Sequence, residues 1–474
     1  MGALHRETSM SQPEQYEVLV LGSGEGGKYL AWHQAKSGRR TAGVERKWIG
    51  GSCPNINCMP SKNEIWSAKV ADLLHHAAKF GLVTSSVETD MVGVRQRKRE
   101  MVDGMIAIHL ERYKASGAEL IMGAARFVAP KTVEVRLNDG GTRVLAGDRV
   151  FLNLGTHATI PPVPGLAEAQ PLTNIELLEI DRLPDHLVIL GGGYVGLEFA
   201  QAYRRFGSRV SLIERGPQLL SHEDPDIAAE IHRILSGEGI EIHLATDLLA
   251  VEGRSGQAVR LRVRATSGEQ IIAGTDILVA TGRTPNTAGI GLEVAGIDLD
   301  ARGYVKVNDR LETTAPGVWA IGECAGSAQF THVSFDDFRV IRDNLGSGNR
   351  STRDRLVPYC LFTDPPLARV GLSEKEARER GVPVRIAKLP MSAVLRARTI
   401  GETAGFMKML IESAGDRVLG FAMLGPESGE VLAAVQTAML GGLPYTVLRD
   451  AILAHPTMAE GLNALLAAVP AAPR

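Results

Sequence analysis

Short apolar runs alternate along the chain with longer segments of helical periodicity. The runs at Tyr16–Leu21 (YEVLVL) and His186–Leu190 (HLVIL) have the length and continuous apolar character of buried strands. The segment Met91–Ser116 has helical periodicity with many charges, and Val133–Leu152 alternates as strands broken by the turn Asn138–Gly141. The pattern predicts a mixed α/β protein.

The last quarter of the chain repeats this alternation in a different order. After about Gly346 we expect three strands at Val382–Leu389, Gly405–Ile411 and Val418–Leu424, followed by helices at Ser428–Leu440 and Pro444–Ile452. Strands followed by helices favour a separate α+β domain.

One glycine pattern occurs twice. GSGEGGKYLA follows the first apolar run and GGGYVGLEFA follows the second, and the two align without gaps. The first, third and sixth positions are glycine in both copies: Gly22, Gly24 and Gly27, then Gly191, Gly193 and Gly196. Each copy is followed, 18 residues past its third glycine, by an acid at the end of a second apolar run: Glu45 and Glu214.

The pattern G-x-G-x-x-G is weak evidence alone, but here each copy follows a strand, opens a helix and is followed by the acid. Such glycines form a tight turn, let a pyrophosphate approach the backbone and allow close helix packing, and the acid binds ribose hydroxyls. The sequence therefore predicts two Rossmann-like dinucleotide sites. An acid at Glu214 repels a 2′-phosphate and favours NAD(H), although Arg204, Arg205, Arg209 and Arg215 lie nearby in sequence and weaken that preference.

The two copies imply that one nucleotide domain is inserted in another. We expect a disordered lead at 1–15, a discontinuous first domain at 16–155 and 276–346, an inserted domain at 156–275 and a C-terminal domain at 347–474. The proline-rich stretch Ile160–Gly165 suits a stiff crossing between domains.

Composition excludes several classes of partner. The 474 residues have a formal charge of −2, which gives no global attraction for nucleic acid or an anionic membrane. The basic run Arg95–Arg99 is interpreted as a solvated helix face, because no aromatic residues interleave with it. The polar N-terminus lacks a secretory h-region and no stretch reaches ~18 apolar residues, so we expect a cytoplasmic protein.

Two of the four cysteines, Cys53 and Cys58, lie close together in sequence. Zinc is disfavoured because Cys324 and Cys360 are isolated, and no metal site is expected. The pair could be two inert core thiols or a redox disulfide. Five helical residues rise about 7.5 Å, whereas bonded cysteines need Cα atoms about 4.4–6.8 Å apart, so a disulfide requires a distorted helix here.

The segment GGSCPNINCMPSK (50–62) resembles the active-site signature of the FAD-dependent pyridine nucleotide–disulfide oxidoreductases, the family of dihydrolipoyl dehydrogenase, glutathione reductase and mercuric reductase. Other stretches similar to that family follow in order: GSGEGG, GGGYVGLE, ATGRTPNT (280–287), GVWAIGECAG (317–326) and AHPTMAE (454–460). The resemblance covers roughly residues 16–465. It implies two Rossmann-like domains, one inserted in the other, and a C-terminal α+β dimerisation domain.

The resemblance also implies roles for the reactive residues. Cys58 is expected to be the thiolate beside the flavin, and Cys53 the outward thiol that exchanges with substrate. His455 matches the family's base, held by Glu460 and acting on the cysteines of the other subunit, which implies a homodimer. Lys62 and Glu198 match an ion pair beside the flavin, and Tyr194 matches a ring that covers the nicotinamide pocket in some members.

Further cofactor contacts are implied at positions that match the family motifs: Gly51, Ser52, Gly155, Gly282, Arg283, Gly322 and Glu323. Glu323 departs from the pattern, because the family usually has Asp there to bind the flavin ribitol. A C-terminal cysteine pair, as mercuric reductase uses, has no counterpart after Cys360, so a mercuric reductase of the usual kind is not expected.

The segments 329–343, 357–371 and 441–460 are similar to the mercuric-reductase-like branch, which includes reactive-chlorine-resistance enzymes. We therefore expect a flavoenzyme that passes electrons from NAD(P)H, with NADH favoured, through FAD and Cys53–Cys58 to a small disulfide, metal ion or oxidant. Dihydrolipoyl dehydrogenase and a flavin-bound redox sensor with little turnover are the alternatives. Phe335, Phe338 and Tyr359 are interpreted as packing residues.

Overall fold

The computed structural model describes residues 12–473, and the chain divides into two compact units. The first unit comprises residues up to 60, 98–157 and 283–354, and the second comprises 61–97, 158–282 and 355 onward. The predicted lead at 1–15 lies largely outside the described residues, and the first strand already begins at Glu14.

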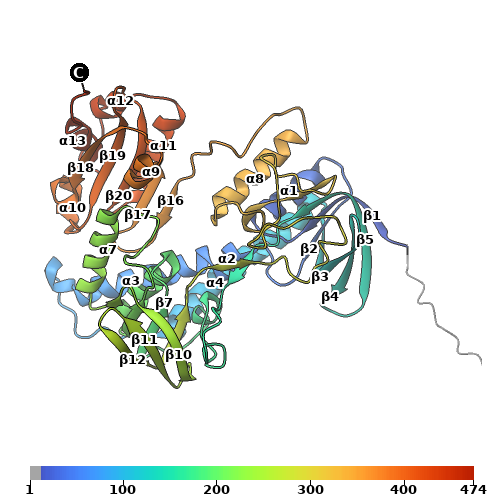
Figure 1. Ribbon diagram of the computed structural model, residues 1–474, viewed down its shortest axis with the longest axis horizontal. Coiled ribbons are helices and arrows are strands. Elements are labelled where there is room, and N and C mark those ends of the chain that lie inside the picture. The colour runs from blue at the N-terminus through green and yellow to red at the C-terminus, as the bar shows by residue number, and fades with distance from the viewer. Residues whose placement is uncertain (1–11, 474) are drawn as a thin grey trace, which may run out of the picture. The chain divides into compact units, whose positions relative to one another are not determined.

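The first unit is built on a parallel sheet (Figure 1). Its strands, in spatial order, are β3 (Glu119–Ala129), β2 (Thr41–Glu45), β1 (Glu14–Leu21), β5 (Thr142–Leu152) and β15 (Val318–Ala320). The strand β4 (Thr132–Leu137) pairs antiparallel with β3 and β5, which run on beyond the parallel sheet. The predicted turn at Asn138–Gly141 joins β4 to β5.

Both faces of this sheet are buried. In β1, Leu19 and Leu21 face one apolar cluster, while Val18 and Val20 face another, as the period of two requires. The helices α1 (Glu25–Lys36) and α8 (Thr331–Asn344) pack against each other. A sheet covered on both sides explains why β1 is an almost continuous apolar run in the sequence.

Two helices run from one unit into the other. The helix α4 spans Met91–Ser116, the range predicted from periodicity, and α3 spans Cys58–His75. A short helix, α2 (Ser52–Ile56), precedes α3 and belongs to the first unit. A 3₁₀ turn, η1, covers Ala77–Phe80, and another, η2, covers Gly322–Ala325.

The second unit contains a second parallel sheet. Its strands, in order, are β13 (Asp276–Val279), β7 (His186–Leu190), β8 (Arg209–Ile213) and β9 (Glu241–His243), with helices α6 (Tyr194–Phe206) and α7 (Pro225–Gly237) connecting them. A three-stranded antiparallel sheet follows: β10 (Asp247–Arg254), β11 (Ala258–Ala265) and β12 (Gly268–Gly274). The repeated β-turn-α pattern of the sequence is thus built once in each unit.

The second unit also includes the C-terminal antiparallel sheet (Figure 1). Its order is β16 (Tyr359–Leu361), β17 (Leu367–Gly371), β20 (Val418–Leu424), β19 (Phe406–Glu412) and β18 (Val384–Pro390). The helix α11 (Ser428–Leu440) packs on β17 and β20, and α13 (Gly461–Ala467) packs on β18 and β19. The strands and helices predicted here therefore form, with ends shifted by a few residues.

The remaining elements are short. They are β6 (Thr156–Ala158), α5 (Asn174–Leu177), β14 (Arg283–Pro285), α9 (Glu374–Glu379), η3 (Met391–Ala393), α10 (Leu395–Ile400) and α12 (Tyr445–Asp450).

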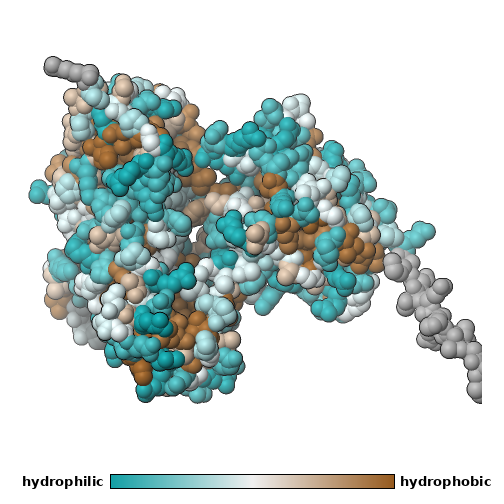
Figure 2. Space-filling model, viewed as in Figure 1, coloured by the Kyte–Doolittle hydropathy of each residue, from teal (hydrophilic) through white to brown (hydrophobic). Residues whose placement is uncertain are grey.

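Polar and apolar residues are interspersed over the face shown in Figure 2, in keeping with the mixed composition. Among the described helices, none combines the length and the hydropathy that crossing a membrane requires.

Candidate functional site

The first glycine turn joins the end of β1 to α1 and leaves no room for side chains. Gly22 has φ +99°, and a Cβ added there would lie 2.2 Å from the Asn153 carbonyl oxygen. A Cβ on Gly24 would lie 2.4 Å from Asn153 Oδ1, and one on Gly27 would lie 2.4 Å from the Gly22 oxygen. Gly22 and Gly27 are therefore required by backbone contacts, as the spacing predicts, and Gly24 lies against the Asn153 side chain.

Glu45 stabilises this turn from the end of β2. Its Oε2 accepts hydrogen bonds from Ser23 N at 2.9 Å and from Ser23 Oγ at 2.8 Å, and its Oε1 accepts from Lys47 N and Trp48 N. The carboxylate is thus held against the glycine turn by four donors. Its predicted contact with a ribose stays a prediction.

The second glycine turn joins β7 to α6 in the same way. Gly191 has φ +106°, and a Cβ on Gly196 would lie 2.0 Å from the Gly191 oxygen. Gly193 is exposed, and an added Cβ would meet nothing within 4 Å, so its lack of a side chain leaves open space rather than allowing packing. Glu214 accepts hydrogen bonds from Gly192 N at 2.7 Å and Gly216 N at 2.6 Å.

The cysteine segment packs directly on the first glycine turn. Gly51 has φ +83°, and a Cβ added there would lie 2.4 Å from Gly24 Cα. Ser52 begins α2, which carries Cys53, and the chain leaves helical geometry at Asn57 before α3 begins at Cys58. The distortion that a Cys53–Cys58 disulfide needs is therefore present between the two helices.

The two thiols interact in this segment of the first unit. Both are half-buried thiols, and a hydrogen bond that Cys53 donates to Cys58, together with burial, raises the pKa of Cys53. Thr331, the first residue of α8, lies with its Oγ1 3.3 Å from Cys58 Sγ and lowers the pKa of Cys53. The cysteine segment and α8 thus place two thiols and a hydroxyl close together.

Glu323 lies in η2 and binds protein groups. Its Oε2 accepts from Arg283 Nε at 3.2 Å and from the hydroxyl of Thr156, and Arg283 Nη2 donates to the Thr156 carbonyl at 3.0 Å. Glu323, the longer replacement for the family's Asp, is therefore anchored by Arg283. A direct contact of Glu323 with a flavin stays a prediction.

The other glycines predicted to contact cofactors lie in turns. Gly155, Gly282 and Gly322 have φ of +65°, +121° and +69°. A Cβ on Gly322 would lie 2.9 Å from Ser334 Oγ of α8, so a side chain there would have to displace that hydroxyl.

Lys62 and Glu198, both in the second unit, form the predicted ion pair. Lys62 Nζ lies 2.7 Å from Glu198 Oε2, and the Glu198 side chain is only 7% exposed. The other carboxylate oxygen accepts from Phe362 N at 2.9 Å, and Lys62 Nζ lies 4.9 Å from the Phe362 ring centre. The pair is thus a supported, largely buried contact rather than a surface charge.

His455 and Glu460 also meet as predicted. His455 Nδ1 lies 2.9 Å from Glu460 Oε2, and the histidine side chain is 68% exposed. The carboxylate therefore orients the ring through Nδ1 and leaves Nε2 as the nitrogen that can exchange a proton with a substrate or thiol.

Sequence reasoning missed three residues that support the first glycine turn and the turn at Gly322. Asn153 accepts from Gly27 N and donates to Ile321 O, and Ser334 Oγ accepts from Gly26 N. Asp337, fully buried, accepts from Gly322 N at 2.7 Å. Asn153 lies 126 residues from Gly27 and Ser334 lies 308 residues from Gly26, so no local spacing in the sequence signals these contacts.

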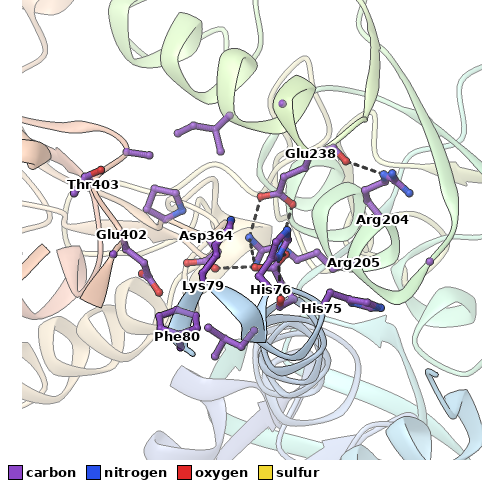
Figure 3. Close-up of a pocket in the computed structure, with 18 residues that line it drawn as sticks. His75, His76, Lys79, Phe80, Arg204, Arg205, Glu238, Asp364, Glu402 and Thr403 are labelled. Atoms are coloured by element: carbon purple, nitrogen blue, oxygen red, sulfur yellow. Dashed lines mark hydrogen bonds and ion pairs between the residues drawn. The ribbon is translucent and has the colours of Figure 1, made fainter. Parts of the chain in front are cut away.

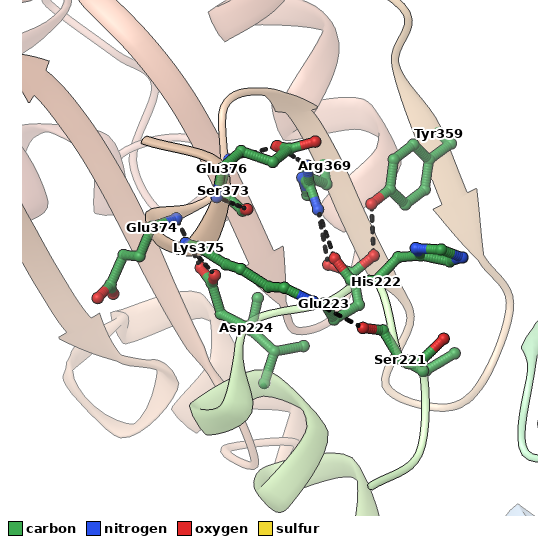
Figure 4. Close-up of polar contacts among 12 residues, drawn as sticks. Ser221, His222, Glu223, Asp224, Tyr359, Arg369, Ser373, Glu374, Lys375 and Glu376 are labelled. Atoms are coloured by element: carbon green, nitrogen blue, oxygen red, sulfur yellow. Dashed lines mark hydrogen bonds and ion pairs between the residues drawn. The ribbon is translucent and has the colours of Figure 1, made fainter. Parts of the chain in front are cut away.

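All three aromatic residues interpreted as packing residues lie against other rings, and the Tyr359 ring centre lies 5.7 Å from that of Tyr194. Phe335 and Phe338 lie 4.7 and 5.9 Å from the Tyr29 ring. Tyr359 differs, since its hydroxyl donates to the buried carboxylate of Glu223 (Figure 4).

A cavity of about 710 Å³ lies elsewhere in the second unit (Figure 3). Arg205 there donates to Glu238 and Asp364, and Lys69 pairs with Asp364 and Glu402, so its carboxylates are matched by cations. Residues predicted for the site do not line this cavity.

Within the described part of the chain, Asp224, Asp226 and Glu374 are grouped closely enough to hold a metal ion. Lys408 Nζ lies 2.7–2.8 Å from an oxygen of each, so an ammonium group already lies where a metal ion would bind.

The two glycine turns fit an FAD and a pyridine nucleotide. In each turn the first and third glycines leave no room for a side chain, and a glutamate is held against the turn by hydrogen bonds. Gly22, Gly24 and Gly27 would hold the flavin dinucleotide near Cys58, and Gly191, Gly193 and Gly196 would hold the nicotinamide dinucleotide. When bound, the flavin accepts hydride from the nicotinamide and passes electrons to a disulfide.

These features define the class. Residues 16–337 match the pyridine nucleotide-disulphide oxidoreductase family, and residues 357–466 match the dimerisation domain of that family. The chain belongs to this family of flavin disulfide reductases.

Among its relatives, the chain is 37% identical to the probable pyridine nucleotide-disulfide oxidoreductase RclA of Escherichia coli strain K12, over 96% of this chain and 99% of RclA. It is 34% identical to a dihydrolipoyl dehydrogenase of Thermus scotoductus, over 94% of this chain and 96% of the relative. It is 32% identical to a mercuric reductase of Bacillus cereus, over 94% of this chain and 70% of the relative.

The solved structure of the Cu(II) complex of the HOCl-induced flavoprotein disulfide reductase RclA from Escherichia coli matches with a TM-score of 0.87 and 36% identity, over 96% of this chain and 99% of that chain. The predicted family, fold class and enzyme class are confirmed: the protein is an NAD(P)H-dependent FAD disulfide oxidoreductase. Its C-terminal segment is the family's dimerisation domain.

Proposed function

We propose that the protein transfers two electrons from NADH through FAD and the Cys53–Cys58 disulfide to a small oxidised acceptor. The observation that carries this is the packing of Gly51 on Gly24, which joins the cysteine segment to the glycine turn that would hold the flavin. In the overall reaction the nucleotide loses a hydride, the disulfide becomes two thiols, and the thiols return their electrons to the acceptor as the disulfide re-forms.

Within the pair, Cys58 is the flavin-side thiol and Cys53 exchanges with the acceptor. Thr331 supports this assignment, because its hydroxyl lies beside Cys58 and can hydrogen-bond a thiolate there. His455 of the partner subunit would hold the proton released by Cys53 at Nε2, while Glu460 of the same subunit fixes its orientation.

The proposed homodimer is supported by apolar surface as well as by the dimerisation domain. Trp66, Val70, Leu73 and Leu74 occupy one exposed stripe of α3 at helical spacing, with Trp66 60% exposed. Ile452, between α12 and α13, is fully exposed near His455 in sequence. Clustered apolar residues of this kind mark an interface.

NADH is the proposed donor because the carboxylate of Glu214 lies against the second glycine turn and would repel a 2′-phosphate. The nearby arginines are partly engaged elsewhere: Arg205 binds Glu238, and Arg204 Nε donates to the Glu238 carbonyl. We expect kcat/KM to be at least about tenfold higher with NADH than with NADPH.

The acceptor is proposed to be a metal ion such as Cu(II), a hypochlorite-type oxidant or a small disulfide. Support comes from RclA, which is described as HOCl-induced and is solved with Cu(II), and from the mercuric reductases. The test is anaerobic reduction with NADH, followed by reoxidation with Cu(II), Hg(II), hypochlorite, quinones and lipoamide.

We expect Cu(II) or hypochlorite to reoxidise the wild-type protein faster than lipoamide does, and Cys53→Ser to abolish the difference. Rapid turnover of dihydrolipoamide with NAD⁺ would establish dihydrolipoyl dehydrogenase activity instead. Failure of both nucleotides to reduce the flavin would establish the redox-sensor alternative.

A further inference from the structure

Glu223 is a buried carboxylate shared by two tyrosines. Its side chain is fully buried, and its Oε1 accepts hydrogen bonds from Tyr194 Oη at 3.2 Å and from Tyr359 Oη. Arg369 Nη1 lies 3.4 Å from the other oxygen (Figure 4). The two tyrosine rings lie 5.7 Å apart, centre to centre.

The two tyrosine hydroxyls help to stabilise the buried charge of Glu223. Arg369 also binds Glu376, so one guanidinium serves two carboxylates. A buried carboxylate is costly unless its oxygens are hydrogen-bonded. Burial and the nearby Glu223 raise the pKa of both Tyr194 and Tyr359, so both hydroxyls remain protonated donors.

The segment 359–362 is linked to two residues of α6 that belong to the proposed hydride site. Tyr194 and Glu198 are four residues apart on α6 and therefore share a face. Phe362 N donates to Glu198, and Tyr359 shares the acceptor of Tyr194. The segment 359–362 thus contacts Glu198 directly and is linked to Tyr194 through the shared carboxylate of Glu223.

We propose that Glu223 is a positioning residue for Tyr194 and that Tyr359 tunes it by competing for the same carboxylate oxygen. The inference rests on the proposed placement of Tyr194 over the nicotinamide pocket. A ring that covers this pocket must rotate as the nicotinamide enters, and its hydrogen bond to Glu223 opposes that rotation.

The shared acceptor predicts opposite effects for two conservative variants. Glu223→Gln removes the charge and weakens the bond to Tyr194, so the ring rotates more easily and the nicotinamide binds more tightly. Tyr359→Phe removes the competing donor and leaves Tyr194 as the one hydroxyl on that oxygen, which strengthens the bond and weakens nicotinamide binding. A purely structural role would change both variants in the same direction.

The test compares the Kd of NAD⁺ with the Kd of ADP-ribose, which lacks the nicotinamide, on the oxidised FAD-loaded protein. We expect Glu223→Gln to lower the Kd of NAD⁺ about threefold to tenfold and Tyr359→Phe to raise it about threefold, on the scale of one hydrogen bond to a charged group. The Kd of ADP-ribose should be unchanged in both. In a Tyr194→Phe background both effects should vanish, because the coupled hydroxyl is absent.

Three results would overturn the positioning role of Glu223. The Kd of NAD⁺ could change in the direction opposite to that expected, the Kd of ADP-ribose could change equally, or the effects could persist in the Tyr194→Phe background. Tyr194→Ala separates this from failure of the underlying assignment. If that variant leaves the ratio of the two Kd values unchanged, Tyr194 does not lie at the nicotinamide. If it changes the ratio while Tyr194→Phe, Glu223→Gln and Tyr359→Phe do not, the placement stands and the Glu223 bond is unimportant.

Discussion

Individual carboxylates have different roles in this protein, which depend on the groups that donate hydrogen bonds to them. Glu45 and Glu214 accept backbone N–H groups and fix the two glycine turns. Glu198 is neutralised by Lys62, and Glu460 orients His455. Spacing in the sequence predicted the places of Glu45 and Glu214, whereas the roles of Glu198 and Glu460 were implied by the resemblance to the family.

Other residues could not be placed from the sequence because their partners are distant in the chain. Glu223 meets Tyr359 across 136 residues, and Gly26 meets Ser334 across 308. Tyr359 was interpreted as packing, which describes its ring but misses its hydroxyl. Such contacts depend on tertiary packing that no local spacing records.

The substitution His455→Ala should slow the exchange between Cys53 and the acceptor at least about a hundredfold, while the rate of flavin reduction by NADH changes less than about threefold. The reason is that the imidazole serves the thiol and takes no part in hydride transfer. Stopped-flow measurement of the two half-reactions checks this, and equal losses in both would contradict the role as base.

Coexpression supplies the matched control for His455. Cys58→Ser chains and His455→Ala chains are each expected to be inactive alone. Hybrid dimers should regain activity, because one of their two sites combines intact cysteines with an intact histidine from the other subunit. No recovery in purified hybrids would show that the histidine does not act across the dimer.

Elements are predicted best where the sequence pattern is periodic. The helix α4 and the strand β20 form over their expected ranges, Met91–Ser116 and Val418–Leu424. The break between α2 and α3 was expected only as a requirement of the disulfide, and the structure places it at Asn57. Propensity alone does not fix such a break, because the segment is also held by tertiary contacts such as that of Gly51 against Gly24.

A pH dependence follows from the packing of α4 on α1. His109 of α4 is buried, its Nε2 accepts from Lys28 Nζ at 3.0 Å, and its ring stacks on Trp32. Burial, with the charges of Lys28 and Arg112, lowers the pKa of His109 to about 4. The folded protein therefore holds this ring neutral where the unfolded chain, with an ordinary pKa near 6.5, already binds a proton.

Because the unfolded state binds more protons, the stabilising effect is complete above about pH 6.5 and is lost as the pH falls toward about 4. We expect the free energy of unfolding to fall by about 1–2 kcal/mol more in the wild-type protein than in His109→Gln between about pH 7 and 5. Urea unfolding at both pH values measures it. His76→Gln, at an exposed ring, is the control, and identical pH slopes for wild type and His109→Gln would contradict the prediction.

For the whole molecule, the repeat in the sequence anticipated two nucleotide-binding folds, and the structure builds one in each unit. The first unit carries Cys53 and Cys58, and the second carries the Lys62–Glu198 pair and His455. The sequence could assign these groups to motifs. It could not show that the chain would gather three separate segments into each unit, because that depends on contacts between distant strands and helices.

The central claim is that electrons from NADH reach Cys53–Cys58 by way of the flavin, and an anaerobic reductive titration tests it most directly. The wild-type protein should take up two electrons more per chain than Cys58→Ser and should develop a long-wavelength absorption band from a thiolate beside the flavin. Equal electron uptake in the two proteins, or the same band in Cys58→Ser, would contradict the account.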